Sequence, residues 1–149
     1  MRLVVQSMGR KFQERLNPWD LTPLHWGILS CLWKEDGLAT QAIARRLQQL
    51  GGTVTVGLDA MEKRKLVARK PDAQDARISR IWLRKRGRDL EAEVVPSVEA
   101  LVEEMFACFS DAELAQLSEQ TDRLLNHLSA SGMEEKFKSG HRGGIRVVT

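Results

Sequence analysis

Residues 69–80 read RKPDAQDARISR and place Asp75-Ala76-Arg77 among further basic side chains, between two runs of residues that favour β-strands. Lysine and arginine side chains attract phosphates, so this stretch could bind a polyanion such as a nucleic acid. A solvated hairpin has a similar polar composition, because surface turns are usually polar. The rest of the chain has to decide between these two interpretations.

Charge is distributed unevenly along the chain, although the formal net charge is only +3. Residues 62–88 contain 11 lysines and arginines and 3 acidic residues, whereas residues 89–135 contain 12 acidic residues and one arginine. This division predicts that the middle of the chain meets a polyanion while the later part has another role. Two well-solvated faces would also explain the pattern, so charge alone does not decide the function.

The composition is that of one folded domain. The chain has 149 residues, of which 42% are hydrophobic and 29% are charged, and this argues against a disordered chain and against two full domains. No apolar run approaches the roughly 20 residues that span a bilayer, and the N-terminal stretch is too short for a secretory signal, so we expect a cytoplasmic protein. Cys31 and Cys108 lie far apart within apolar stretches, which is typical of buried free thiols.

Helical periodicity dominates the first quarter of the chain. Apolar residues recur at helical spacing between residues 5 and 16, and this helix should end near Asn17-Pro18, because proline disfavours helical geometry in the preceding residue. Thr22 and Pro23 predict the start of the next helix, with threonine as N-cap and proline in the first turn. Residues 24–34 are apolar on most of the helix circumference, so this helix should be buried.

Two shorter helices and a hairpin follow. Thr40 can cap a helix over residues 41–50, which the pair Gly51-Gly52 should break. Residues 53–56 are β-branched and favour a strand, but the apolar spacing that follows fits a helix capped by Thr53. Two short helices joined in this way form a helix-turn-helix, whose second helix can lie in a DNA major groove. The strand-like runs at 65–70 and 78–83 then make the opening segment the tip of a β-hairpin, or wing.

These elements resemble the MarR family of winged helix-turn-helix transcriptional regulators. The matching pieces are LTPLHWGILSCL, ATQAIARRL, TVTVGLDAMEKRKLVARK and DAQDARISRIWLRKRG, within residues 21–87. The most specific piece is Asp75-x-Arg77 soon after Leu-Val-x-Arg. The resemblance implies a mainly α-helical fold with a small β-wing, in which a winged helix-turn-helix DNA-binding region over residues 21–88 carries N- and C-terminal dimerisation helices.

The resemblance also implies roles for individual residues. Arg77 would enter the minor groove of DNA, where a narrow groove concentrates negative potential, while Asp75 would hold the arginine and its loop. Thr53, Thr55 and Val56 would lie near base edges at the start of the recognition helix. The other candidates would bind phosphates and position the protein without reading sequence: Thr40, Gln41, Lys63, Arg69, Lys70 and Arg80.

This sequence departs from the family pattern at two positions. The family often carries an arginine where this chain has Val56, which removes a strong guanine contact from the recognition helix. It often carries a glycine where this chain has Lys65, and the lysine would add a phosphate contact.

Two long helices complete the predicted single domain, residues 1–149. Apolar residues from Val94 to Phe109 form a broad stripe, in which Pro96 predicts a kink or a break. Residues 110–113 read SDAE, a capping box that starts the last helix, with the leucines at 114, 117, 124 and 128 on its buried side. We expect residues 1–17 and 89–130 to form a homodimer on near-palindromic double-stranded DNA, although an intramolecular core would bury the same side chains. Residues 131–149 should form a flexible tail.

The signal that releases the DNA is suggested by the resemblance alone. The family commonly binds small lipophilic or phenolic ligands between the winged domain and the dimerisation helices, and the resemblance places His25, Trp26 and Trp33 there. Tryptophans are more often part of a core. Some relatives sense peroxides through a cysteine in the first helix, a position that neither Cys31 nor Cys108 matches. The histidines show no metal-ligand spacing, and we expect no cofactor.

The sequence therefore predicts a homodimeric DNA-binding repressor released by a small molecule. It predicts no enzyme, because the chain has no nucleophile elbow, no phosphate-cradling glycine loop and no metal-ligand spacing. Two alternatives stay open, a winged-helix scaffold that binds protein and a thiol-based redox-sensing regulator. A protein-binding scaffold has no reason to keep Arg77 at the wing tip with a basic block behind it, which favours DNA as the partner.

Overall fold

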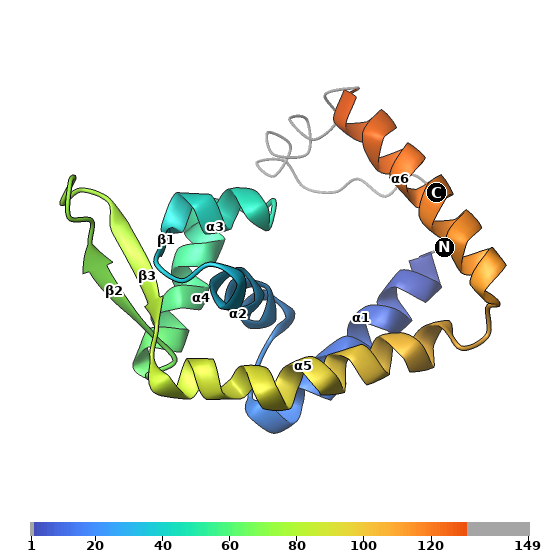
Figure 1. Cartoon of the computed structure of the whole chain (residues 1–149), viewed down its shortest axis with the longest axis horizontal. Helices are drawn as coiled ribbons and strands as arrows, with labels where there is room; N and C mark the ends of the chain where they lie inside the picture. Colours follow the sequence, from blue (N-terminus) through green and yellow to red (C-terminus); the bar gives the residue numbers. More distant parts are fainter. Residues whose placement is uncertain (1, 131–149) are drawn as a thin grey trace, which may run out of the picture. The chain divides into compact units, whose positions relative to one another are not determined.

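The computed structural model describes residues 2–130, and it divides into two units, Met1–Met105 and Phe106–Thr149 (Figure 1). None of the described helices is long and apolar enough to cross a membrane. The elements in chain order are α1 (Arg2–Leu16), the 3-10 turn η1 (Asn17–Trp19), α2 (Pro23–Lys34), β1 (Leu38–Ala39), α3 (Thr40–Arg46), α4 (Gly51–Lys63), β2 (Val67–Pro71), β3 (Ser79–Leu83), α5 (Lys85–Phe106) and α6 (Asp111–Ala130).

The first two helices begin and end where their sequence predicts. Helix α1 ends at Leu16, immediately before Asn17-Pro18. Thr22 caps α2 through a reciprocal pair of hydrogen bonds, because the His25 N–H donates to the Thr22 hydroxyl and the Thr22 N–H donates to His25 Nδ1, each at 3.2 Å. Burial, and secondarily the charge of Arg64, lowers the pKa of His25, which keeps Nδ1 available as an acceptor.

The boundary between α3 and α4 differs from the sequence prediction. Helix α3 begins at Thr40 itself, without a side-chain cap, and ends at Arg46 instead of running to residue 50. The pair Gly51-Gly52, expected to break a helix, forms the first turn of α4, so Thr53 is not its N-cap. Helix α3 ends earlier than predicted because Gln48 adopts a positive φ of 50°. This left-handed conformation usually marks a helix end at a glycine, and here a glutamine takes it.

The core of the first unit is built by α2, α3, α4 and the sheet. Helix α4 buries the apolar residues that its spacing predicts, which confirms that the β-branched stretch at its start is helical. Their side chains join those of α2 in one hydrophobic cluster, whose fully buried members include Ile28, Leu29, Ile43, Val54, Leu58, Met61, Leu66 and Ile81. Because α4 is packed along this side, its first residues are left at the surface.

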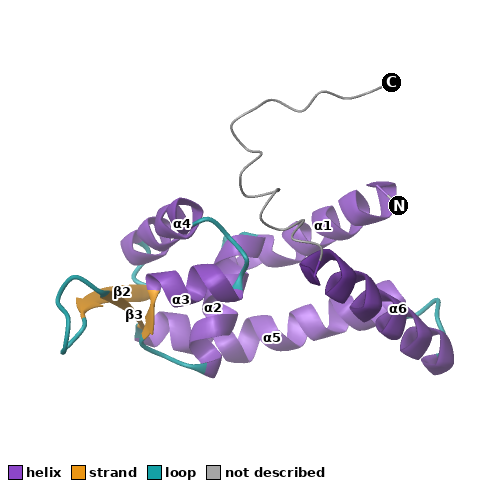
Figure 2. Cartoon of the chain, turned by 90° about the horizontal axis from the view of Figure 1, so that it is seen from above, coloured by secondary structure: helices purple, strands orange, loops and turns teal. Residues whose placement is uncertain are grey.

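Three antiparallel strands form the sheet, in the order β1-β3-β2. The two predicted strands are β2 and β3, whose register pairs Arg69 with Ile81 and Ala68 with Trp82. Strand β1 was not predicted, because two residues are too few to show a period-2 pattern. Figure 2 shows the β2–β3 hairpin extending away from the helices. This confirms the predicted fold class, mainly helical with a small wing.

Helix α5 leaves the end of β3, and its second half is linked to α1 by side-chain contacts. It is continuous from Lys85 to Phe106, so Pro96 does not break it. At the start of α5, Gly87 lies close to the turn between α4 and β2. A Cβ added at Gly87 would be 2.2 Å from the carbonyl oxygen of Leu66 in that turn. Farther along, Arg15 of α1 donates to a carboxylate oxygen of Glu104 at 3.0 Å.

The second unit contains α6, which begins at the predicted capping box. The Ser110 N–H donates to Glu113 at 2.8 Å, and the Glu113 N–H donates to the Ser110 hydroxyl at 3.4 Å. The leucine face expected to be buried is not buried within the single chain, since Leu117 and Leu124 are 40% and 48% exposed. Residues 131–149, predicted to form a tail, lie outside the described residues.

Candidate nucleic-acid interface

The start of α4 presents an accessible helix N-terminus. Nothing lies within 4 Å of a Cβ added at Gly51 or Gly52, so the backbone is open to a large partner here. Thr53, Thr55 and Val56 are exposed, and Val56 keeps 70% of its accessible surface. The Thr55 hydroxyl donates to the Gly51 carbonyl at 2.9 Å, which leaves its oxygen lone pair and its methyl group for a partner. A helix N-terminus also carries a partial positive charge that favours phosphates.

Three of the predicted phosphate contacts come from helix termini. Thr40 and Gln41 are the first two residues of α3, where Thr40 is half-buried and Gln41 is exposed. Lys63 is the last residue of α4, ten residues and therefore about 15 Å along the axis from Thr53. The structure thus separates Lys63 from the start of the recognition helix.

At the wing tip, Asp75 holds Arg77 by three contacts. The Arg77 backbone N–H and its Nε both donate to Asp75 Oδ1 at 3.0 Å, and an η-nitrogen donates to Oδ2 at 3.2 Å. These hydrogen bonds lower the pKa of Asp75. The Arg77 side chain is nevertheless 91% exposed, so the carboxylate orients the guanidinium without covering it. A charged, oriented and exposed guanidinium is suited to enter a narrow groove of negative potential.

The loop behind this pair is organised by Asp72, which was not predicted from the sequence. One Asp72 carboxylate oxygen accepts the N–H groups of Gln74 and Asp75 at 2.8 and 3.1 Å, and the other pairs with Arg80. The hydrogen bond from Arg80, followed by those from the two backbone amides, lowers the pKa of Asp72 to about 2. The Pro-Asp sequence at the turn could have predicted this role, because an aspartate side chain in a turn often accepts a hydrogen bond from the backbone amide two residues later.

We expect Asp72→Asn to destabilise the protein at neutral pH and to have no effect in strong acid. The carboxylate pKa is lowered on folding, so its ionised form stabilises the fold above pH 3.8, and that stabilisation is lost as the pH falls towards about 2. The measurement is urea-induced unfolding of both proteins from pH 7 to pH 2. A gap in stability that stays constant across this range would contradict the assignment.

Two of the predicted phosphate contacts, Arg69 and Arg80, are engaged inside the molecule. Arg69 lies 2.5 Å from Asp59 and 3.2 Å from Glu62, with its side chain only 28% exposed, and ties β2 to α4. Arg80 pairs with Asp72 and donates to the Gly37 carbonyl at 3.0 Å. Both arginines therefore position the wing relative to the helices.

The residues predicted to line a ligand pocket are used in packing and capping. Trp26 packs edge-to-face against Phe12 and Trp33, with ring centroids 6.2 and 5.6 Å apart. The Trp33 indole N–H donates to the Gly87 carbonyl at 2.9 Å, and the His25 imidazole completes the cap of α2. All three are half-buried, so their role in ligand binding stays a prediction.

The two cysteines differ in exposure, and the described part of the chain has no cluster of candidate metal ligands. Cys31 is buried, and desolvation raises the pKa of its thiol, which disfavours the reactive thiolate. Cys108 is exposed rather than buried as its sequence predicts. No group of three or more metal-binding side chains occurs among residues 2–130.

Comparison with known proteins gives a consistent result. The family model described as "MarR family" matches residues 21–79. The uncharacterised HTH-type transcriptional regulator YsmB of Bacillus subtilis is 28% identical over 115 residues, which is 77% of this chain and 79% of the relative. The HTH-type transcriptional repressor MdtR of the same species is 25% identical over 128 residues, covering 83% of each chain. The structure of Staphylococcus aureus MepR in complex with DNA superposes with a TM-score of 0.80 and 29% identity, covering 85% of this chain and 94% of MepR.

Proposed function

Because the chain belongs to the MarR family of winged helix-turn-helix DNA-binding transcriptional regulators, we propose that it is a homodimeric repressor that reads its operator with α4 and with Arg77. Members of this family are not enzymes. The observation that carries the proposal is Arg77 at the wing tip, oriented by Asp75 and 91% exposed. A wing that bound protein alone would have no need of a guanidinium held in this way.

In the proposed complex, the start of α4 enters the major groove and the wing tip enters the adjacent minor groove. Thr53 and Thr55 offer hydroxyls to base edges, and Val56 offers methyl groups that pack on thymine methyls. The hydrophobic side chain at position 56 cannot donate to guanine, so the wing and the DNA shape supply a larger share of the specificity. The likeness to MepR, which was solved bound to DNA, supports this arrangement.

A homodimer explains the apolar surface that the single chain leaves open. Leu3, Val4 and Val5 of α1 are between 60% and 73% exposed, and Leu124 and Leu125 of α6 are 48% and 55% exposed. Exposed apolar side chains that follow one another along a helix are typical of subunit interfaces. A twofold dimer predicts a near-palindromic operator with half-sites about one helical turn apart.

The proposal includes two regulatory features, repression of the target gene and release of the DNA by an effector. MdtR is named a repressor, which supports the same role here. We favour a small lipophilic effector over a redox signal, because neither cysteine lies in α1 and burial raises the pKa of the Cys31 thiol. The protein-binding scaffold is the second candidate, and a DNA-binding measurement separates it from the regulator.

The experiment is a fluorescence anisotropy titration of the purified protein on DNA from upstream of its own gene, against a scrambled duplex, over a series of salt concentrations. We expect binding that prefers the native sequence and weakens steeply with salt, since phosphate contacts release counterions. Weak binding that is equal on both duplexes would instead favour the protein-binding scaffold.

A further inference from the structure

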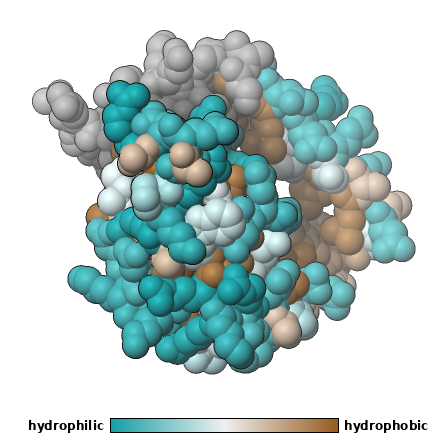
Figure 3. Space-filling view, turned by 60° about the vertical axis from the view of Figure 1, so that its left-hand side comes forward, coloured by the Kyte–Doolittle hydropathy of each residue, from teal (hydrophilic) through white to brown (hydrophobic). Residues whose placement is uncertain are grey.

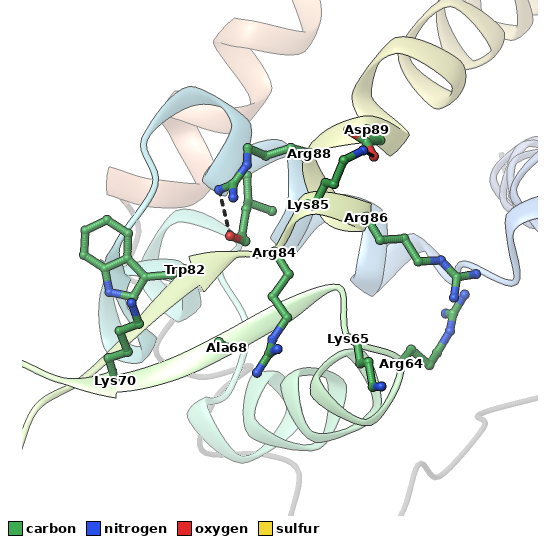
Figure 4. A pocket seen from close by; sticks show the side chains of 11 residues that line it. Arg64, Lys65, Ala68, Lys70, Trp82, Arg84, Lys85, Arg86, Arg88 and Asp89 are labelled. Carbon is green, nitrogen blue, oxygen red and sulfur yellow. Dashed lines mark hydrogen bonds and ion pairs between the residues drawn. The ribbon is translucent and has the colours of Figure 1, made fainter.

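A cationic groove lies on the outer face of the wing, where α4, the sheet and α5 meet (Figure 4). It has a volume of about 750 Å³ and is open to solvent. It is lined by seven lysine and arginine side chains, by Asp89, and by the apolar residues Ala68, Trp82 and Leu83. Of the DNA contacts expected above, only Lys65 and Lys70 line this groove.

Three of the cations in this groove have no acidic partner. Lys65, Arg84 and Arg86 form no ion pair in the described part of the chain, whereas Lys85 is paired with Asp89 at 2.7 Å. In Figure 4 the guanidinium groups of Arg64 and Arg86 point toward one another, and Arg64 is itself paired with Asp20 at 3.5 Å. Like charges close together repel, so an anion bound beside Lys65, Arg84 and Arg86 would stabilise the arrangement.

The alternation of side chains along β3 places the groove and the wing tip on the same line. Arg80, Trp82 and Arg84 alternate with the buried side chains of the strand and therefore share its outer face. On the neighbouring strand, Lys70 lies 5.9 Å from the centre of the Trp82 ring. The basic side chains thus run from the tip at Arg77 to the groove over roughly 20 Å, since each strand residue adds about 3.3 Å.

The groove is better suited to an extended polyanion than to a small ligand. Small-molecule pockets bury most of their ligand, whereas this groove is open to solvent and lined by seven lysine and arginine side chains. The wing side of the surface is largely hydrophilic, with only scattered hydrophobic areas, which disfavours a lipid or a hydrophobic protein segment (Figure 3). In the proposed DNA complex, the polyanion next to the wing tip is the operator itself, continuing beyond the half-site.

We propose that the groove formed by Lys65, Arg84 and Arg86 binds the phosphate backbone of the DNA that flanks each half-site, with the duplex bent along the outer face of the wing. This inference rests on the proposed function, because it requires the wing tip to be docked on DNA. Asymmetric neutralisation of phosphates on one side of a duplex favours bending toward that side, and the cost of bending depends on the flanking sequence. The flanking DNA would increase the affinity, and its shape would contribute to specificity without any contact to a base.

The test compares two duplexes and two matched variants. The short duplex ends at the wing-tip contacts, and the long duplex extends it by about ten base pairs, one helical turn, at each end. Arg84→Gln combined with Arg86→Gln removes two unpaired cations from the groove. Lys34→Gln combined with Arg45→Gln removes the same charge from exposed positions in the last turns of α2 and α3, which the proposed contacts do not use, and serves as the control. Affinity, its salt dependence and the bend angle of the long duplex are measured for each protein.

We expect the wild type and the control to bind the long duplex more tightly than the short one, and to bend it. The groove variant should bind the short duplex like the wild type but show roughly tenfold weaker affinity for the long duplex, with a salt slope reduced by about 0.9 for each phosphate that the protein no longer neutralises. Equal behaviour of the groove variant and the wild type on the long duplex overturns the inference. A difference seen only when a second duplex is added also overturns it, since the groove would then bridge separate DNA molecules. Failure of the wild type to prefer the short operator over a scrambled duplex overturns the proposed function instead.

Discussion

Replacing Arg77 with alanine is expected to weaken operator binding by roughly 10- to 100-fold, the effect of removing one specific arginine from a DNA interface. The side chain is 91% exposed, and its charge, oriented by Asp75, would lie where the narrow minor groove is most negative. Dimerisation and folding should not change, because within residues 2–130 the side chain that holds Arg77 is that of Asp75, two residues away in the same loop.

The measurement for this variant pairs an anisotropy titration with sedimentation of the free protein. Lys34→Ala, at an exposed position in the last turn of α2, is the control and should leave operator affinity within about twofold of the wild type. If Arg77→Ala reduced operator binding and dimerisation to the same extent, the wing assignment would be wrong.

Gly87→Ala is expected to lower the free energy of unfolding by about 3 kcal/mol, the scale of a severe overpacking change. An added Cβ would lie 2.2 Å from the Leu66 carbonyl oxygen, which is a backbone atom and cannot rotate away. Moving α5 to relieve this contact would also disturb the hydrogen bond from Trp33 to the Gly87 carbonyl. These costs outweigh the gain of about 1 kcal/mol that alanine brings to a helix interior.

Gly9→Ala is the control for this experiment, because nothing lies within 4 Å of a Cβ added at that position of α1. It should stabilise the protein slightly, by up to about 1 kcal/mol. Denaturant unfolding followed by tryptophan fluorescence measures both variants. If Gly87→Ala were as stable as Gly9→Ala, the tight packing of α5 against the end of α4 would be refuted.

Much of the fold could be predicted because its signals are local. Asn17-Pro18 ends α1, Thr22 caps α2 and Ser110 caps α6, each through a residue that acts on its own neighbours. The α3–α4 boundary could not be predicted in this way. Gln48 takes a left-handed conformation that a sequence pattern assigns to glycine, and packing of α4 against α2 fixes the glycine pair inside a helix.

The candidate site was predictable only where its chemistry is local. Asp75 and Arg77 are two residues apart, so their pairing follows from the sequence, and the structure contains that contact. The pairing of Arg69 with Asp59 and Glu62 depends on the docking of β2 on α4, which no spacing in the sequence reveals. The unpaired cations of the groove were equally hidden, because they come together only when the turn after α4 meets the start of α5.

Entry of Arg77 into the minor groove can be tested by hydroxyl-radical footprinting of the operator with the wild type and with Arg77→Ala. Hydroxyl radicals attack the sugars along the minor groove. We predict that the wild type protects two minor-groove segments placed symmetrically outside the major-groove contacts of α4. At saturating concentration, Arg77→Ala should lose protection of those two segments and keep the rest of the wild-type footprint. Identical footprints for the two proteins would contradict the proposed role of Arg77.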